Sequence, residues 1–206
     1  MAVTPPPEVQ QEALREARSL RRRGRIRWLP PENLHLTLKF LGETPEPEIS
    51  GLRGALAAVC GRHRAFDLDL RGAGAFPSAR RARVLWVGVG EGSERLRTLA
   101  GDFEDALESL GFEREKRPFH PHVTVGRAGE SDARLEDQEL DTGVGPLPFR
   151  AGSVELVQSR LSRGGAAYST VASYQLEEGM PSSGLHDREQ RPDRHQDKEK
   201  YQDHGD

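Results

Sequence analysis

The sequence predicts an α+β fold: a bilobal molecule with two pseudo-twofold-related lobes of antiparallel sheet, outer helices, and a groove between the lobes. Two observations predict this fold. Short segments with the period-two alternation of half-buried strands are interspersed with segments whose apolar residues recur at helical spacing. The chain also repeats itself, because a shift of 87 positions places His35 on His122 and Thr37 on Thr124.

The same shift superposes positions outside the two histidine segments. It places Gly24 on Gly111 and Val9 on Leu96. Glycine is typical of helix ends, and spaced apolar residues are typical of the buried face of a helix. The repeat therefore indicates that both halves share one supersecondary plan.

Length and composition set the domain organisation. The chain has 206 residues, which suits one two-lobed domain, and we expect it to span 1–178. The segment 179–206 is almost wholly polar, with mixed charge and no periodicity. Such a segment cannot offset its ordering entropy, so we expect it to be disordered. The formal net charge of -3 excludes no class of partner, because local patches matter more than the sum.

Cysteine usage and hydropathy exclude some classes of protein. The single Cys60 cannot form an internal disulfide, and no cysteine cluster resembles a zinc site. No apolar run is long enough to cross a membrane, and the N-terminus lacks the features of a signal peptide. We therefore expect a soluble, cytoplasmic monomer with no membrane partner.

The first half begins with a strand, a helix and two further strands. Proline cannot lie inside a sheet, so Pro5–Pro7 end the first strand. Glu8 suits the positive end of a helix dipole, and Gly24 is expected to stop this helix. In order, we expect a strand at 1–4, a helix to about residue 23, and strands at 26–29 and 33–40.

The first half continues with a helix for which Thr44 is the expected N-cap. Its apolar residues recur at helical spacing up to Val59. Residues 66–71 alternate as a one-sided strand does, and 72–82 is expected to be a loop because it is rich in Gly, Ala and Arg. Residues 84–87 are continuously apolar, which predicts a central strand covered on both faces.

The second half repeats the plan. Ser93 is the expected N-cap of a helix that Gly111 ends. The residues expected to face inward are Leu96, Leu99, Phe103, Leu107 and Leu110. In order, we then expect a strand at 112–115, the strand with His122, a polar helix at 131–138, and strands at 149–161 and 168–176.

The two histidine strands carry the chemistry. In each, the histidine and the threonine two places on project from one face. If the lobes face each other, His35 and His122 meet across the groove, with Thr37 and Thr124 beside them. One imidazole can take a proton from an attacking water while the other protonates the departing oxygen of a phosphodiester. Threonine hydroxyls can donate to the non-bridging oxygens, so no metal or cofactor is needed.

Three separated segments resemble a known family. Residues 33–42, residues 74–78 with 83–88, and residues 117–127 closely resemble RNA 2',3'-cyclic phosphodiesterases of the two-histidine phosphoesterase superfamily, the LigT-like enzymes once described as 2'-5' RNA ligases. The resemblance covers roughly residues 2–177. It implies the bilobal α+β fold and an RNA or nucleotide substrate with a 2',3'-cyclic phosphate end.

The resemblance also implies residue roles. His35 would donate a proton to the leaving ribose 3' oxygen, His122 would activate water, and the product would be a 2'-phosphomonoester. Arg127 matches a family arginine at the groove. Strict alternation would point Arg127 away from His122, so strand twist or a β-bulge must re-aim it. Family members usually begin with a longer first strand, so either translation starts upstream or this strand is short.

Other hypotheses stay open. One is ligation of tRNA halves through a 2'-5' linkage, and another is a nucleotide- or RNA-binding module without turnover. A zinc site at His35, His120 and His122 lacks an obvious supporting carboxylate. The arginines Arg80, Arg81 and Arg83 could steer RNA phosphates or be merely solvated, and Phe76 and Phe119 could stack on a base or pack in the core.

Overall fold

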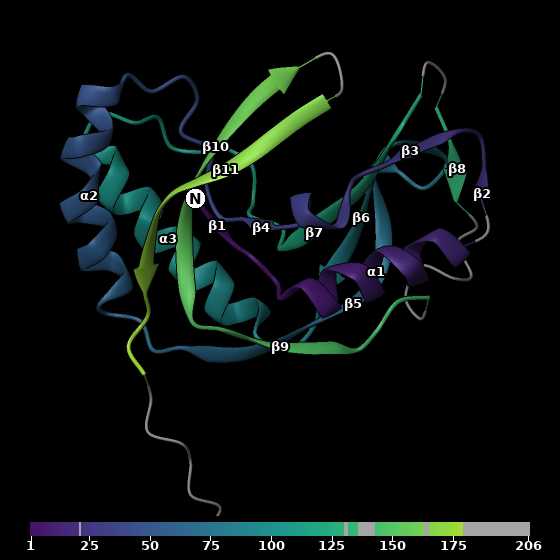
Figure 1. The fold of residues 1–206 in the computed structure, drawn as a ribbon, viewed down its shortest axis with the longest axis horizontal. Coiled ribbons are helices and arrows are strands. Elements are labelled where there is room, and N and C mark those ends of the chain that lie inside the picture. The colour runs from purple at the N-terminus through teal and green to yellow at the C-terminus, as the bar shows by residue number, and fades with distance from the viewer. Residues whose placement is uncertain (21, 130–131, 136–142, 163–164, 179–206) are drawn as a thin grey trace, which may run out of the picture.

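The computed structural model describes residues 1–20, 22–129, 132–135, 143–162 and 165–178. The helices are α1 (Pro7–Ser19), α2 (Glu46–Cys60) and α3 (Ser93–Glu108). Figure 1 shows α2 and α3 side by side at one end of the molecule and α1 nearer the other, with strands β1, β4 and β7 passing between. The predicted α+β class with antiparallel sheet is confirmed.

The main sheet consists of nine strands within the described residues. Its order is β11 (Gly165–Gln175), β10 (Ser153–Ser162), β1 (Ala2–Val3), β4 (Leu36–Thr37), β7 (His122–Ala128), β6 (Arg81–Val89), β5 (Phe66–Ser78) and β9 (Leu147–Ala151), with β3 (Ile26–Trp28) also on β7. Neighbouring strands pair antiparallel. A second sheet pairs β2 (Arg22–Arg23) with β8 (Arg134–Leu135), and η1 (Pro31–Asn33) is a 3-10 turn.

The internal repeat is visible in three dimensions. Helix α1 begins at Pro7 and α3 begins at Ser93, a separation close to the 87-residue shift of the repeat. Both helices place apolar residues in one core. Gly24 and Gly111 both adopt positive φ, at 97° and 90°. The two histidine strands are nevertheless hydrogen-bonded neighbours in one continuous sheet. The finer division into two lobes stays a prediction.

The predicted loop at 72–82 is wrong. Strand β5 continues to Ser78 and β6 begins at Arg81, so only a tight turn separates them. A Cβ at Gly74 would collide with the indole of Trp86 on the neighbouring strand. The small residues that suggested a loop are therefore packing partners inside a hairpin. The predicted central strand at 84–87 is confirmed as part of β6, which lies between β7 and β5.

Helix ends differ from the predictions. Helix α1 ends at Ser19 rather than near residue 23, because Leu20 is already extended and the next described residues form β2. Helix α2 has Pro45 as its N-cap, and the Thr44 hydroxyl instead donates to the carbonyls of Leu41 and Gly42.

Helix α3 differs at both ends. Its N-cap is Gly92 with φ 78°, so Ser93 is the first helical residue and not the cap. At the other end, Leu110 lies beyond the last turn and is 47% exposed, whereas the other residues predicted to face inward are buried.

Several strand predictions are also corrected. Residues 112–115 form no strand, and the first histidine strand has regular pairing only at Leu36–Thr37. The strand predicted at 149–161 is two strands separated at Gly152. Of the helix predicted at 131–138, Arg134–Leu135 is strand β8, and 131 and 136–138 lie outside the described residues. The tail 179–206 also lies outside them. No helix in the described ranges is long and apolar enough to span a bilayer.

Candidate active site

The register of β4 against β7 brings the two histidine segments together. Leu36 is paired with Val123, and both side chains are buried in the core. Side chains one position away from such a pair lie on the opposite face of the sheet. The residues that share this outer face are His35, Thr37, His122 and Thr124.

These four residues form a two-by-two block. In the antiparallel register, His35 lies across from Thr124 and Thr37 lies across from His122. The two histidines are therefore diagonal neighbours, with roughly 7–8 Å between backbone positions. That separation leaves room for a phosphate group between the two imidazoles.

Both imidazoles are held by a backbone hydrogen bond of the same design. His35 Nδ1 donates to the carbonyl of Asn33 at 2.8 Å, and His122 Nδ1 donates to the carbonyl of His120 at 2.6 Å. A neutral ring that donates from Nδ1 keeps Nε2 as its proton acceptor. Each ring is thus fixed in the tautomer that can exchange a proton through Nε2.

Burial sets the acidity of the two rings. Desolvation lowers the pKa of His35 below its ordinary value of 6.5, partly offset by the Asn33 carbonyl, and the charges of the N-terminal amine and of His122 lower it further. Desolvation likewise lowers the pKa of His122, partly offset by the His120 carbonyl. Each ring disfavours a charge on the other, because two imidazolium ions at this distance would repel. The pair favours at most one charged ring.

Aromatic rings flank both histidines. The ring of Tyr168 on β11 meets His35 edge-on at a centroid distance of 4.8 Å. On the other side, Phe76 meets His122 at 5.2 Å, and Trp86 lies 5.4 Å from Phe76. Edge-on packing restricts ring rotation, so the imidazoles are positioned by their neighbours as well as by the backbone.

A β-bulge in β7 re-aims Arg127. Trp86 on β6 pairs with Thr124, and two positions along β6, Val84 pairs with Arg127. The extra β7 residue is Val125, which shifts the register between these pairs. Cross-strand partners share a face, and Val84 and Trp86 share a face of β6. Arg127 therefore lies on the same face as Thr124, although the two residues are three positions apart. The side chain is exposed at the end of the histidine block.

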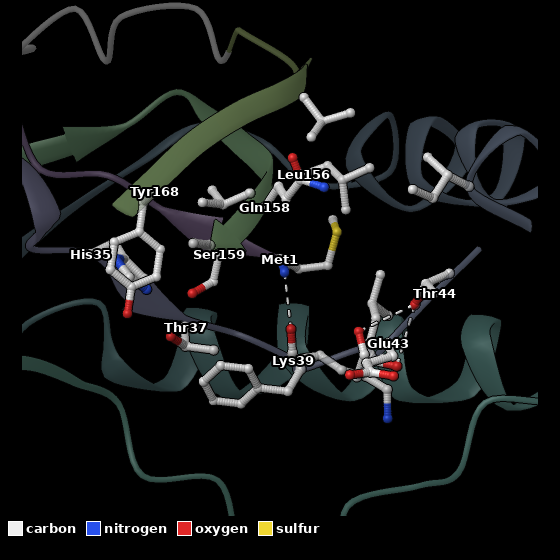
Figure 2. Close-up of a pocket in the computed structure, with 17 residues that line it drawn as sticks. Met1, His35, Thr37, Lys39, Glu43, Thr44, Leu156, Gln158, Ser159 and Tyr168 are labelled. Atoms are coloured by element: carbon white, nitrogen blue, oxygen red, sulfur yellow. Dashed lines mark hydrogen bonds between the residues drawn. The ribbon is translucent and has the colours of Figure 1, made fainter. Parts of the chain in front are cut away.

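A groove of about 460 Å³ opens beside His35 and Thr37. One wall is the β10–β11 hairpin, which contributes Gln158, Ser159 and Tyr168. Figure 2 shows Tyr168 with His35 at one end and Thr37 along the side opposite Ser159. Phe40 also lines the groove and is 81% exposed, an unusual exposure for a phenylalanine.

Other candidate residues take different positions. Arg81 and Arg83 share Asp132 as an ion-pair partner, at 3.3 Å and 2.9 Å. Phe119 packs partly buried against the core. Among the residues that the structure describes, no cluster of histidine, cysteine, aspartate or glutamate could hold a metal ion.

Sequence reasoning did not find Tyr168, Phe40 or Gln158. Tyr168 reaches the site from a strand more than a hundred residues after His35, and nothing local in the sequence marks that contact. For Phe40 the sequence signal was misleading, because it continues the apolar alternation of Leu36 and Leu38, which predicts burial.

A sequence model described as "2'-5' RNA ligase superfamily" matches residues 5–163. A protein of Aeropyrum pernix named RNA 2',3'-cyclic phosphodiesterase is 41% identical over 145 residues, covering 68% of this chain and 80% of that protein. A protein of Thermotoga maritima with the same name is 31% identical over 174 residues, covering 84% of this chain and 92% of that protein.

Solved structures agree on the fold. The crystal structure of E. coli LigT complexed with 3'-AMP matches with a TM-score of 0.68 and 25% identity. The match covers 85% of this chain and 95% of that chain.

Proposed function

This chain belongs to the 2'-5' RNA ligase superfamily, and we propose that it hydrolyses RNA 2',3'-cyclic phosphodiester ends to 2'-phosphomonoesters by a metal-independent mechanism with two histidines. The names of the relatives support the substrate class. The observation that carries the proposal is the diagonal pair of imidazoles, each fixed through Nδ1 so that Nε2 is left for proton transfer.

The proposed reaction divides the work between the rings. His122 Nε2 accepts a proton from water as the water oxygen forms a bond to phosphorus. The bond from phosphorus to the ribose 3' oxygen breaks, and His35 Nε2 gives that oxygen its proton. Charge grows on the non-bridging oxygens, where the hydroxyls of Thr37 and Thr124 and the guanidinium of Arg127 stabilise it.

The groove supports the placement of the nucleoside. It lies on the His35 side, where the leaving 3' oxygen and its ribose must be. Its walls combine an exposed phenylalanine, Phe40, with the amide of Gln158, which suits the flat face and polar edge of a nucleobase.

The test is hydrolysis of a 2',3'-cyclic nucleotide in the presence of EDTA, with the product identified as the 2' or 3' phosphate by ³¹P NMR. We expect the 2' phosphate. We also expect His35→Ala and His122→Ala to lose about 10²-fold or more in kcat, because each removes a proton-transfer group. The matched control is His63→Ala, since His63 pairs with Asp102 at 2.8 Å outside the groove. Full activity in both site variants would sink the proposal.

Two alternatives predict different results in the same assay. A binding module without turnover would bind the 2' phosphate tightly and leave the cyclic nucleotide intact. An enzyme devoted to ligation would join tRNA halves through a 2'-5' linkage faster than it hydrolyses the cyclic end.

A further inference from the structure

A second cavity, of about 270 Å³, lies on the other side of the histidine pair. The groove beside His35 is built from β11, β10, β1, β4 and the loop after β4. The second cavity is built from β5, β6, the residues just before β7 and Arg97 on α3, so the two flank the boundary between β4 and β7. Its lining includes Arg71, Arg97, His120, Trp86, Gly88 and Gly90.

The indole ring of Trp86 forms part of the cavity wall. Trp86 Nε1 is buried and has no hydrogen-bond partner among the described residues. The Trp86 ring lies against His120, at a centroid distance of 4.7 Å, and against the backbone of Gly74. Because Nε1 is buried, the ring offers the cavity an aromatic surface and not a free donor.

The charge of the cavity is positive. Arg71 is held against the buried carboxylate of Asp69, which compensates its charge. Arg97 forms an ion pair with Glu94, whose side chain is 87% exposed, and also donates to the Ser93 hydroxyl. Exposed pairs of this kind are weak, so Arg97 keeps most of its attraction for an anion. Gly90 has no side chain, which leaves room for the Arg71–Asp69 pair.

We propose that this cavity is a phosphate subsite, which binds an RNA phosphate other than the one that the histidines attack. Arg97 is its principal donor, and the Trp86 ring is its aromatic wall. Grooves that bind single-stranded RNA combine cationic side chains with aromatic rings in this way. The inference rests on the proposed cyclic phosphodiesterase activity, because that activity puts an RNA end between the two cavities.

The phosphate can come from two sources. One is the phosphate on the 5' side of the terminal nucleotide. The other is a phosphate within a second strand, and the 5'-hydroxyl of that strand replaces water as the nucleophile at His122. In that case the 5' oxygen bonds to phosphorus, the bond to the 3' oxygen breaks, His122 takes the 5'-hydroxyl proton, and His35 protonates the 3' oxygen.

Binding is tested without turnover. The chain has two tryptophans, Trp28 and Trp86, so a ¹⁵N spectrum shows two indole signals, and Trp86→Phe assigns them. We expect inorganic phosphate to shift the Trp86 signal in a saturable way. Arg97→Gln should weaken this binding about tenfold or more, since it removes a charged donor. The matched control is Arg95→Gln on the same helix, whose guanidinium lies over Phe66 instead, 5.8 Å from its ring centroid.

Kinetics distinguish the two sources. If the subsite serves the same strand, a 2',3'-cyclic nucleotide with a 5' phosphate should exceed its 5'-hydroxyl counterpart about tenfold in kcat/KM. Arg97→Gln should bring that ratio close to one, and Arg95→Gln should not. If the subsite serves a second strand, the parent protein should have nearly equal kcat/KM for the 5'-phosphate and 5'-hydroxyl substrates. An added 5'-hydroxyl oligonucleotide should then yield a 2'-5' product, and Arg97→Gln should reduce its yield.

An unshifted Trp86 signal at saturating phosphate, or equal binding in Arg97→Gln, would overturn the subsite even if the enzyme hydrolyses cyclic nucleotides. Loss of hydrolysis with an intact Trp86 titration would instead overturn the proposed function and leave the subsite standing.

Discussion

At the scale of single residues, the site is defined by how two imidazoles are held. Each uses Nδ1 to donate to the carbonyl two positions back, at Asn33 and at His120. Each bond joins two residues of the same segment that are two positions apart, so both copies of the repeat form it. What differs is the surroundings, with Tyr168 against one ring and Phe76 against the other.

The shifted acidities predict a pH profile. Hydrolysis requires His122 neutral and His35 charged, so kcat/KM should be bell-shaped. Activity falls on the acid side as His122 gains a proton and on the alkaline side as His35 loses one. Because burial lowers the pKa of His35, the alkaline limb should begin below the ordinary histidine value of about 6.5. Measuring kcat/KM for a cyclic nucleotide across pH checks this, and a monotonic profile contradicts it.

The bulge that re-aims Arg127 allows a second prediction at this scale. Arg127→Gln should lower kcat/KM about tenfold, because it removes a charged donor from the end of the histidine block. Thermal unfolding should change little, since the side chain is exposed. Arg134→Gln, on β8 outside the main sheet, is the matched control. Equal activity of Arg127→Gln and the parent protein would remove Arg127 from the site.

At the scale of elements, the β5–β6 hairpin forms the wall behind His122. Its sequence looked like a loop because Gly and Ala have low strand propensity. The pairing of this segment with β6 outweighs that propensity, and Gly74 lies under the Trp86 indole. The requirement for a small residue comes from a ring on another strand, which local sequence cannot reveal.

Gly74→Ala tests the hairpin. The new methyl group would collide with the Trp86 ring, so we expect a loss of about 1–3 kcal/mol in the free energy of unfolding. Activity should also fall, because Trp86 packs against Phe76 beside His122. The control is Gly101→Ala within α3, where nothing lies within 4 Å and about 0.5–1 kcal/mol of stabilisation is expected. Urea unfolding measures both, and a neutral Gly74→Ala would contradict the packing.

At the scale of the whole molecule, a buried ion pair connects the two halves of the repeat. Lys39, just after β4, places Nζ 2.6 Å from Glu104 on α3 and 2.7 Å from the carbonyl of Glu113. Glu104 also accepts from the backbone of Glu115. The network fixes the segment that leads into β7, and thereby helps to place His122 relative to the first histidine strand.

Lys39→Met should destabilise the fold by about 3–5 kcal/mol, because it leaves a carboxylate buried without its partner. The Lys39 side chain is 3% exposed and that of Glu104 is 14% exposed. Adding Glu104→Leu should recover most of the loss, since an apolar pair leaves no charge unpaired. Denaturant unfolding of both variants measures the coupling, and additive effects would show that the pair is unimportant.

The sequence by itself determined the α+β class and predicted the histidine and threonine pairs, because strand alternation and the repeat can be read along the chain. Arg127 was predicted from its match to a family arginine, against strict alternation. The sequence also required a bulge or strand twist at Arg127 before any register was known. Only the tertiary structure decided that the two histidine strands are direct neighbours, that Tyr168 and Phe76 flank the rings, and that a second cavity lies beyond His122. These contacts join residues far apart in the chain, and packing between strands selects them, so no local pattern encodes them.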